Sequence, residues 1–151
     1  MARFTTTLAV PQSAEKTFAF VSAFDRTAEW DAGVAEAQKL TEGPVRLGTR
    51  FRVVAAFFGR RVEMIYTVTQ LEAPHRIVLR GESSTVISED EILVTPKPDD
   101  ASDASILTWD ARLTLKGLLW LGDPALHLAF QWIGRKAMHG LEQALGAQRV
   151  T

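Results

Sequence analysis

A series of strand-like segments followed by one long amphipathic segment constrains the fold of this chain more than any other feature. Between residues 34 and 116, apolar and polar residues alternate with a period of two, as in strands with one covered and one solvated face. In the last segment Leu107 and Trp109 fall on one side, and Thr108 and Asp110 fall on the other. The alternation predicts an antiparallel sheet.

Turn residues divide this region into six strands, and one further strand precedes two short helices. Ser13 is expected to cap the first helix, of about ten residues, and Asp25 the second, over Asp25–Trp30. The expected strands cover 3–10, Val34–Leu40, Gly48–Phe57, Arg61–Leu71, Arg76–Gly81, Val86–Thr95 and Ile106–Lys116.

The long segment begins at Asp123-Pro124, a strong helix start, and is expected to end near Leu145, before Gly146. Its apolar residues recur every three or four positions and form one stripe. One helix cannot cover a flat sheet of about seven strands. We therefore predict an α+β fold, a single domain over residues 1–151, in which a strongly curved antiparallel sheet grips the C-terminal helix. Such a sheet leaves an internal gap near its open end.

The composition excludes several classes of function. The 17 basic and 18 acidic residues are mixed along the chain and give a net charge of −1, so no basic stripe indicates nucleic-acid binding. There are no cysteines, and therefore no disulfides or thiolate sites. The apolar runs are too short to span a bilayer, and the N-terminus lacks the pattern of a signal peptide. We expect a cytoplasmic protein without integral membrane association.

No recognised catalytic or cofactor-binding motif is present, and no cofactor is predicted. His75 follows a proline in a turn and is expected to be exposed. His127 and His139 lie twelve residues apart on the predicted helix, roughly 18 Å along its axis, which is too far to share a metal ion. No metal site is expected.

The segment from Val86 to Thr95 leaves its orientation open, because both of its faces carry apolar residues. If Val86 and Ile92 point inward, Ser88 and Asp90 place polar groups on the inner wall. We favour the alternative, in which this half of the strand is solvated near a sheet end. An inward Asp90 would be a candidate acid or base, as would Tyr66.

Tyr66 and Trp109 are the better candidates for contact with a ligand, since both fall on apolar faces and carry a polar atom. Ordinary core packing is the alternative for both. Phe51 and Met64 belong to the same expected wall, and Phe130 and Ile133 would line it from the helical stripe.

Two apolar patches are candidates for the mouth of a cavity: Phe57 with Phe58 at a hairpin tip, and the run 118–121, which contains Leu119 and Trp120. Three roles stay open for them, namely covering the mouth, forming a homodimer contact or touching a membrane surface. Burial against the helix is the simpler alternative.

The chain resembles the START-like helix-grip superfamily, which contains the major birch-pollen allergen, and within it the bacterial polyketide cyclase/dehydrase-like families. The resemblance spans nearly the whole chain and rests on Val10-Pro11, Phe18, Trp30-Asp31, Leu40 to Gly43-Pro44, Gly48-Thr49-Arg50-Phe51, Tyr66, Ala73-Pro74-His75-Arg76, Thr108-Trp109, Leu115-Lys116-Gly117 and Asp123-Pro124. It implies that the two short helices form a V that supports one end of the long helix. Trp30 then becomes a candidate for the cavity end.

The expected function is binding of a small hydrophobic or amphipathic molecule, such as a lipid, polyketide or aromatic metabolite, between the sheet and the C-terminal helix. One alternative is an aromatase/cyclase-type enzyme that uses a polar residue in that cavity. A protein-interaction module is the second alternative. The resemblance implies a cavity but not catalysis, because one fold serves many functions.

Overall fold

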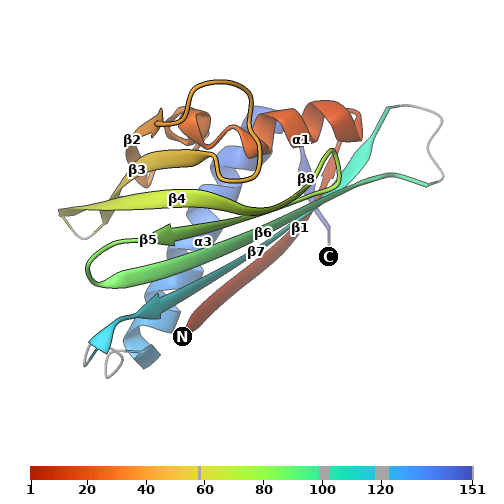
Figure 1. Ribbon diagram of the computed structural model, residues 1–151. Coiled ribbons are helices and arrows are strands. Elements are labelled where there is room, and N and C mark those ends of the chain that lie inside the picture. The colour runs from red at the N-terminus through yellow and green to blue at the C-terminus, as the bar shows by residue number, and fades with distance from the viewer. Residues whose placement is uncertain (58, 99–102, 118–122, 151) are drawn as a thin grey trace.

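The computed structural model describes residues 1–57, 59–98, 103–117 and 123–150 (Figure 1). The chain follows the predicted order of one strand, short helices, a series of strands and a long helix. The elements are β1 (Ala2–Val10), α1 (Ala14–Ser22), the 3-10 helix η1 (Phe24–Arg26), α2 (Thr27–Trp30), β2 (Val34–Lys39), β3 (Arg50–Phe57), β4 (Arg60–Glu72), β5 (Arg76–Glu82), β6 (Val86–Pro96), β7 (Ser105–Leu115), α3 (Asp123–Leu145) and β8 (Gln148–Arg149).

All eight strands form one open antiparallel sheet in the order β2-β3-β4-β5-β6-β7-β1-β8. From β2 to β7 the strands are neighbours in sequence, and each pairs with the next. The first strand pairs with β7 along its whole length, from Ala2 opposite Leu113 to Val10 opposite Ser105. The predicted α+β class with an antiparallel sheet and a C-terminal helix is confirmed.

Two local predictions need correction. The predicted sheet lacked β8, whose residues Gln148 and Arg149 pair with Ala9 and Leu8 of β1. Both residues of β8 are exposed, so no apolar alternation marks the strand. The second short helix is also divided into a 3-10 turn and one turn of α-helix, and Asp25 lies inside η1 without capping either of them.

The core lies between the sheet and α3, which crosses one face of the sheet in Figure 1. The helix packs against β1 and α2. Alternation along β1 buries Phe4, Thr6 and Leu8, while their neighbours are exposed or half-buried. In the described part of the chain, no helix has the length and apolarity needed to cross a membrane.

The opposite face of the sheet carries ion pairs, one of which includes the buried carboxylate of Asp110. Asp110 pairs with two arginines, Arg112 of its own strand and Arg3 of the neighbouring strand, and Arg3 is the closer partner. Arg3 donates from Nε at 3.0 Å and from Nη2 at 2.6 Å to the two carboxylate oxygens, whereas Arg112 lies at 3.6 Å. The bidentate geometry joins β1 to β7.

A close approach of two backbones fixes α3 against the end of α2. Gly140 of α3 faces the carbonyl oxygen of Trp30, and a Cβ atom at this position would lie only 1.9 Å from that oxygen. Only glycine therefore permits this contact. Because Trp30 and α3 both border the cavity described below, the contact also sets the distance between two of its walls.

Replacing Gly140 by alanine is expected to destabilise the protein by about 1–3 kcal/mol, because the methyl group forces the two backbones apart. The helix propensity of alanine, which favours it over glycine by about 1 kcal/mol, would otherwise predict a gain. Urea unfolding of Gly140→Ala and of Arg135→Ala, an exposed position on the same helix, measures the effect. If the free energy of unfolding of G140A equals or exceeds that of wild type, while that of R135A is unchanged, this account is wrong.

Candidate functional site

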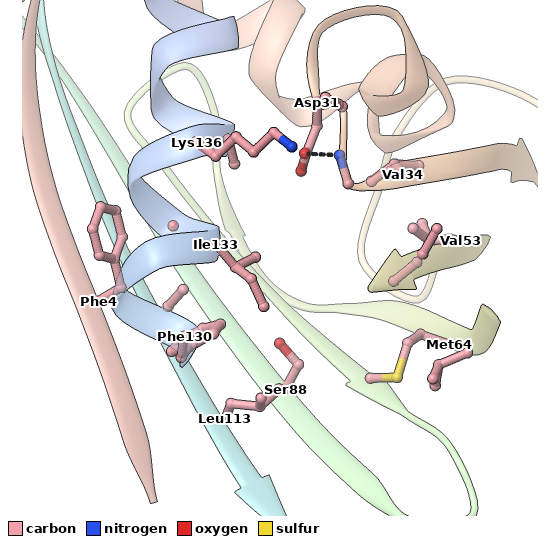
Figure 2. Close-up of a pocket in the computed structure, with 18 of the residues that line it drawn as sticks. Phe4, Asp31, Val34, Val53, Met64, Ser88, Leu113, Phe130, Ile133 and Lys136 are labelled. Atoms are coloured by element: carbon pink, nitrogen blue, oxygen red, sulfur yellow. Dashed lines mark hydrogen bonds between the residues drawn. The ribbon is translucent and has the colours of Figure 1, made fainter. Parts of the chain in front are cut away.

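A cavity of about 620 Å³ lies between the sheet and α3. Figure 2 shows side chains from α3, β1, β7 and the β2–β4 region that converge on it. Strands β3, β4, β6 and β7 contribute inward residues, and α3 contributes the opposite wall. The single helix that covers the broad sheet thus leaves unfilled space beside it, as the predicted architecture requires.

The cavity wall is mainly apolar. Side chains from the sheet and from α3 face each other across it, and the apolar ones include Phe4, Met64, Trp109, Leu113, Phe130 and Ile133. These residues come from several different elements. A pocket lined in this way favours apolar ligands, and the few polar groups in its wall determine how a ligand is oriented.

Asp90 is the principal polar group in the inner wall. Its side chain is only 7% exposed. Oδ1 accepts a hydrogen bond of 2.8 Å from Trp109 Nε1, and Oδ2 accepts one of 3.4 Å from Ser88 Oγ. Burial raises the pKa of Asp90 from 3.8 to about 6, and the two hydrogen bonds act in the opposite direction. A carboxyl group with such a pKa can give or take a proton near neutral pH.

The favoured orientation of β6 is therefore wrong. Val86, Ser88 and Asp90 point inward and line the cavity, and the neighbouring Ile87 and Glu89 point the other way. The pairing of β6 with β5 and β7 sets this register. The alternation within the strand could not choose between two faces that both contain apolar residues.

Tyr66 lies beside this polar group and also lines the cavity. Burial raises the pKa of Tyr66, as does the negative charge of Asp90, while its hydrogen bond with Ser88 acts in the opposite direction. Its ring covers Gly81 of β5, where an added Cβ atom would lie 2.6 Å from the ring. Gly81 therefore provides the space that holds the Tyr66 ring flat against β5.

Phe24 is the centre of an aromatic cluster behind the cavity wall, and no pattern in the sequence singled it out. Its ring centroid lies 5.2 Å from that of Tyr66, 5.9 Å from that of Phe51 and 6.0 Å from that of Trp109. The residue lies in η1, where it is followed by the charged residues Asp25 and Arg26. The short helices thus hold two cavity-lining aromatic rings from behind.

Trp30 borders the cavity at the end of α2 and packs edge-on against Trp109, with ring centroids 5.7 Å apart. Its indole Nε1 is buried and has no hydrogen-bond partner among the described residues. An unpaired buried donor usually costs about 1–3 kcal/mol. Packing against Trp109 and α3 therefore holds Trp30 in place without help from that polar atom.

The expected ligand-binding residues divide into two groups. Trp30, Met64, Tyr66, Trp109, Phe130 and Ile133 line the cavity. Phe51 does not line it, because it is fully buried behind the wall against Phe24. Of the four residues expected at the mouth, the side chain of Phe57 and the whole of Phe58, Leu119 and Trp120 lie outside the described residues.

Seven exposed residues form the mouth of the cavity. They come from the α2–β2 loop, the β3–β4 hairpin and α3, and they are Ala32, Ala56, Gly59, Arg60, Arg61, Trp132 and Lys136. The opening therefore lies between α3 and the edge of the sheet at β2 and β3. Within the described part of the chain, no three His, Asp or Glu side chains are grouped as a metal site requires.

Replacing Asp90 by asparagine is expected to change how stability depends on pH. The folded state raises the pKa of Asp90, so it favours the protonated acid, and wild-type stability falls as the pH rises from about 4 through about 6. Asparagine stays neutral and keeps an acceptor for Trp109. The D90N variant should therefore gain up to about 3 kcal/mol relative to wild type over this range.

Urea unfolding at a series of pH values measures this difference. Asp103→Asn, which removes an exposed carboxylate, is the matched control and should follow the wild type. If the curves of D90N and wild type stay parallel, the folded state does not favour the protonated form of Asp90.

Comparison with solved structures shows that the fold is shared with proteins of low sequence identity. A protein from Thermus thermophilus superposes with a TM-score of 0.76 at 15% identity, covering 95% of this chain and 96% of that one. A START superfamily protein from Mycobacterium smegmatis gives 0.65 at 18% identity, with coverages of 91% and 99%. Ara h 8.0201 gives 0.65 at 14% identity, with coverages of 95% and 96%.

No curated protein is similar enough in sequence to match this chain. Residues 1–146 match the family described as "Polyketide cyclase / dehydrase and lipid transport". The match includes every strand from β1 to β7 and all of α3, and therefore the whole cavity. This agrees with the START-like resemblance of the sequence, and the chain belongs to the polyketide cyclase/dehydrase and lipid transport family.

Proposed function

We propose that this protein binds a small hydrophobic or amphipathic molecule in the cavity between the sheet and α3. The observation that carries the proposal is the cavity itself, about 620 Å³ in volume and lined mainly by apolar side chains. Pockets that enclose small molecules usually measure about 300–1,000 Å³ and have walls of this kind. The family description, which names polyketide cyclases and lipid transport, is consistent with such a ligand.

The cost of an unfilled apolar space also favours a binding role. Apolar side chains that line an unfilled pocket lose the dispersion contacts that a packed core would give them. Larger side chains at Ala111 or Ala129, both in the wall, would reduce that cost. A sequence that keeps small residues there keeps the space open, as a binding protein requires.

The direct test is native mass spectrometry of the protein purified from its own host, followed by solvent extraction. The proposal predicts a discrete apolar molecule bound in near-stoichiometric amount. If the protein carries no such molecule and binds none from a panel of lipids and aromatic metabolites, the proposal is wrong.

A larger side chain inside the cavity should weaken ligand binding. We expect Ala111→Phe, on the inner face of β7, to reduce the affinity for the uncharged fluorescent probe N-phenyl-1-naphthylamine at least about tenfold, since the ring occupies the space of the ligand. Ala129→Phe is a second such variant, at a half-buried position of α3. Ala144→Phe, at an exposed position of the same helix, is the control.

Fluorescence titration gives the affinities, and circular dichroism with urea unfolding verifies that each variant folds. If A129F binds N-phenyl-1-naphthylamine as tightly as A144F and wild type do, the probe does not bind in the cavity.

One observation favours a second candidate function, an enzyme of the cyclase/dehydratase type. Asp90 places a carboxyl group with a raised pKa in the wall of an otherwise apolar cavity. Its carboxylate could accept a proton from the carbon beside a substrate carbonyl. The resulting enolate carbon would then bond to a second carbonyl carbon, and the oxygen of that carbonyl would take up the proton from Asp90. This reaction needs no cofactor.

The two candidates differ in what Asp90→Asn changes. If the protein is such an enzyme, D90N should lower the turnover of a linear tetraketide thioester by about 10²–10⁴-fold, because asparagine cannot transfer the proton. Affinity for N-phenyl-1-naphthylamine should stay near the wild-type value. A wild-type protein that binds the thioester without converting it would exclude the enzyme and leave the binding function.

A further inference from the structure

The mouth of the cavity carries an excess of positive charge. Of its seven exposed lining residues, Arg60, Arg61 and Lys136 are cationic and none is acidic. The chain as a whole has a net charge of −1. The positive charge at the opening is therefore a local feature and does not follow from the overall composition.

These cations come from both sides of the opening. Arg60 and Arg61 begin β4 at the hairpin, and Lys136 lies on α3. Lys136 Nζ lies 5.2 Å from the centroid of the Trp132 ring, which holds the ammonium group at the mouth. A negatively charged group in the opening could therefore contact cations from the sheet and from the helix.

Protein carboxylates neutralise these cations only in part. Arg60 has no ion-pair partner within the part of the chain that the structure describes. Arg61 lies 3.9 Å from Glu36, and both side chains are more than half exposed, a geometry that contributes little. Arg60 and Arg61 therefore remain available to contact a negatively charged ligand.

Asp31 is an acidic residue of the cavity lining, and it lies next to Ala32 of the mouth. It is half-buried, and its Oδ1 accepts a hydrogen bond of 2.8 Å from the backbone N–H of Gly33. Burial raises its pKa, and that hydrogen bond and the charge of Lys136 act in the opposite direction. Figure 2 shows the Lys136 side chain extending toward Asp31. Even with both Asp31 and Glu36 ionised, three cations against two carboxylates leave the mouth positive.

The inner wall has the opposite charge. Asp90 is the charged residue there among the described lining residues, and its hydrogen bonds come from neutral groups. An anionic group placed deep in the cavity would meet this carboxylate and lose its hydration, which is doubly unfavourable. At the mouth the same group would keep part of its hydration and meet Arg60 and Lys136. The two ends of the cavity therefore favour one orientation of a charged ligand.

On the basis of the proposed binding function, we propose that the ligand is an anionic amphiphile. Its oxyanion head group lies at the mouth between Arg60 and Lys136, and its apolar tail extends inward along Phe130 and Ile133. A carboxylate and a phosphate share this chemistry, and both accept hydrogen bonds from guanidinium and ammonium groups.

The test compares three probes that share one alkyl chain: dodecanoate, dodecyl phosphate and the uncharged 1-dodecanol. Each displaces N-phenyl-1-naphthylamine from the wild type and from the double variant Arg60→Gln/Lys136→Gln. The double variant Arg80→Gln/Lys97→Gln is the control, because it removes two exposed positive charges outside the cavity. Neither double variant changes a buried residue.

We expect R60Q/K136Q to bind the better of the two anions about tenfold more weakly than wild type, while its affinity for 1-dodecanol stays the same. The control should bind all three probes as wild type does. Raising the salt concentration should weaken anion binding only. The anion that loses more affinity identifies the head group as a carboxylate or a phosphate.

Two outcomes would overturn the proposal, and they are distinguishable. If 1-dodecanol binds but R60Q/K136Q weakens the anions no more than the alcohol, the cavity binds apolar molecules without selecting an anionic head group. If neither the alcohol nor the fluorescent probe binds to the wild type, the binding function itself fails.

Discussion

The rest of the structure depends on the mismatch between one helix and a broad sheet. Strands lie about 4.8 Å apart and a helix with its side chains is about 10 Å across, so α3 covers only about two of the eight strands. The helix packs over β1, and the contact between Gly140 and Trp30 fixes it against α2. The remaining inner surface must be covered by the short helices or left open. The cavity is the part left open.

Much of this architecture could be predicted from the sequence, because periodicity and turn residues are local signals. The strands from β2 to β7 and the helix α3 each carry such a signal, and the structure contains all of them. A two-residue strand such as β8 carries none, since both its residues are exposed and its partners are distant in sequence. The ion pair between Asp110 and Arg3 is hidden for the same reason, since the two residues are 107 positions apart in the sequence.

The site was harder to predict than the fold, for a physical reason. Alternation shows which residues share a face, but it does not show whether that face meets a cavity or packed side chains. Phe51 and Met64 fall on neighbouring strands of the sheet and looked equivalent, yet Phe51 packs against Phe24 while Met64 lines the cavity. The charges at the mouth come from a hairpin and a helix, and only the tertiary structure brings them together.

The position of β1 in the sheet has a consequence for the order of folding. Its partner β7 begins more than ninety residues later, and α3, which packs over β1, comes later still. The hairpins from β2 to β7 can form as the chain leaves the ribosome, whereas β1 must wait for nearly the whole chain. Within this sheet, the strand that comes first in the sequence is thus among the last to be paired. Until then the inner face of the sheet lacks its helix, and a nascent chain has no enclosed cavity.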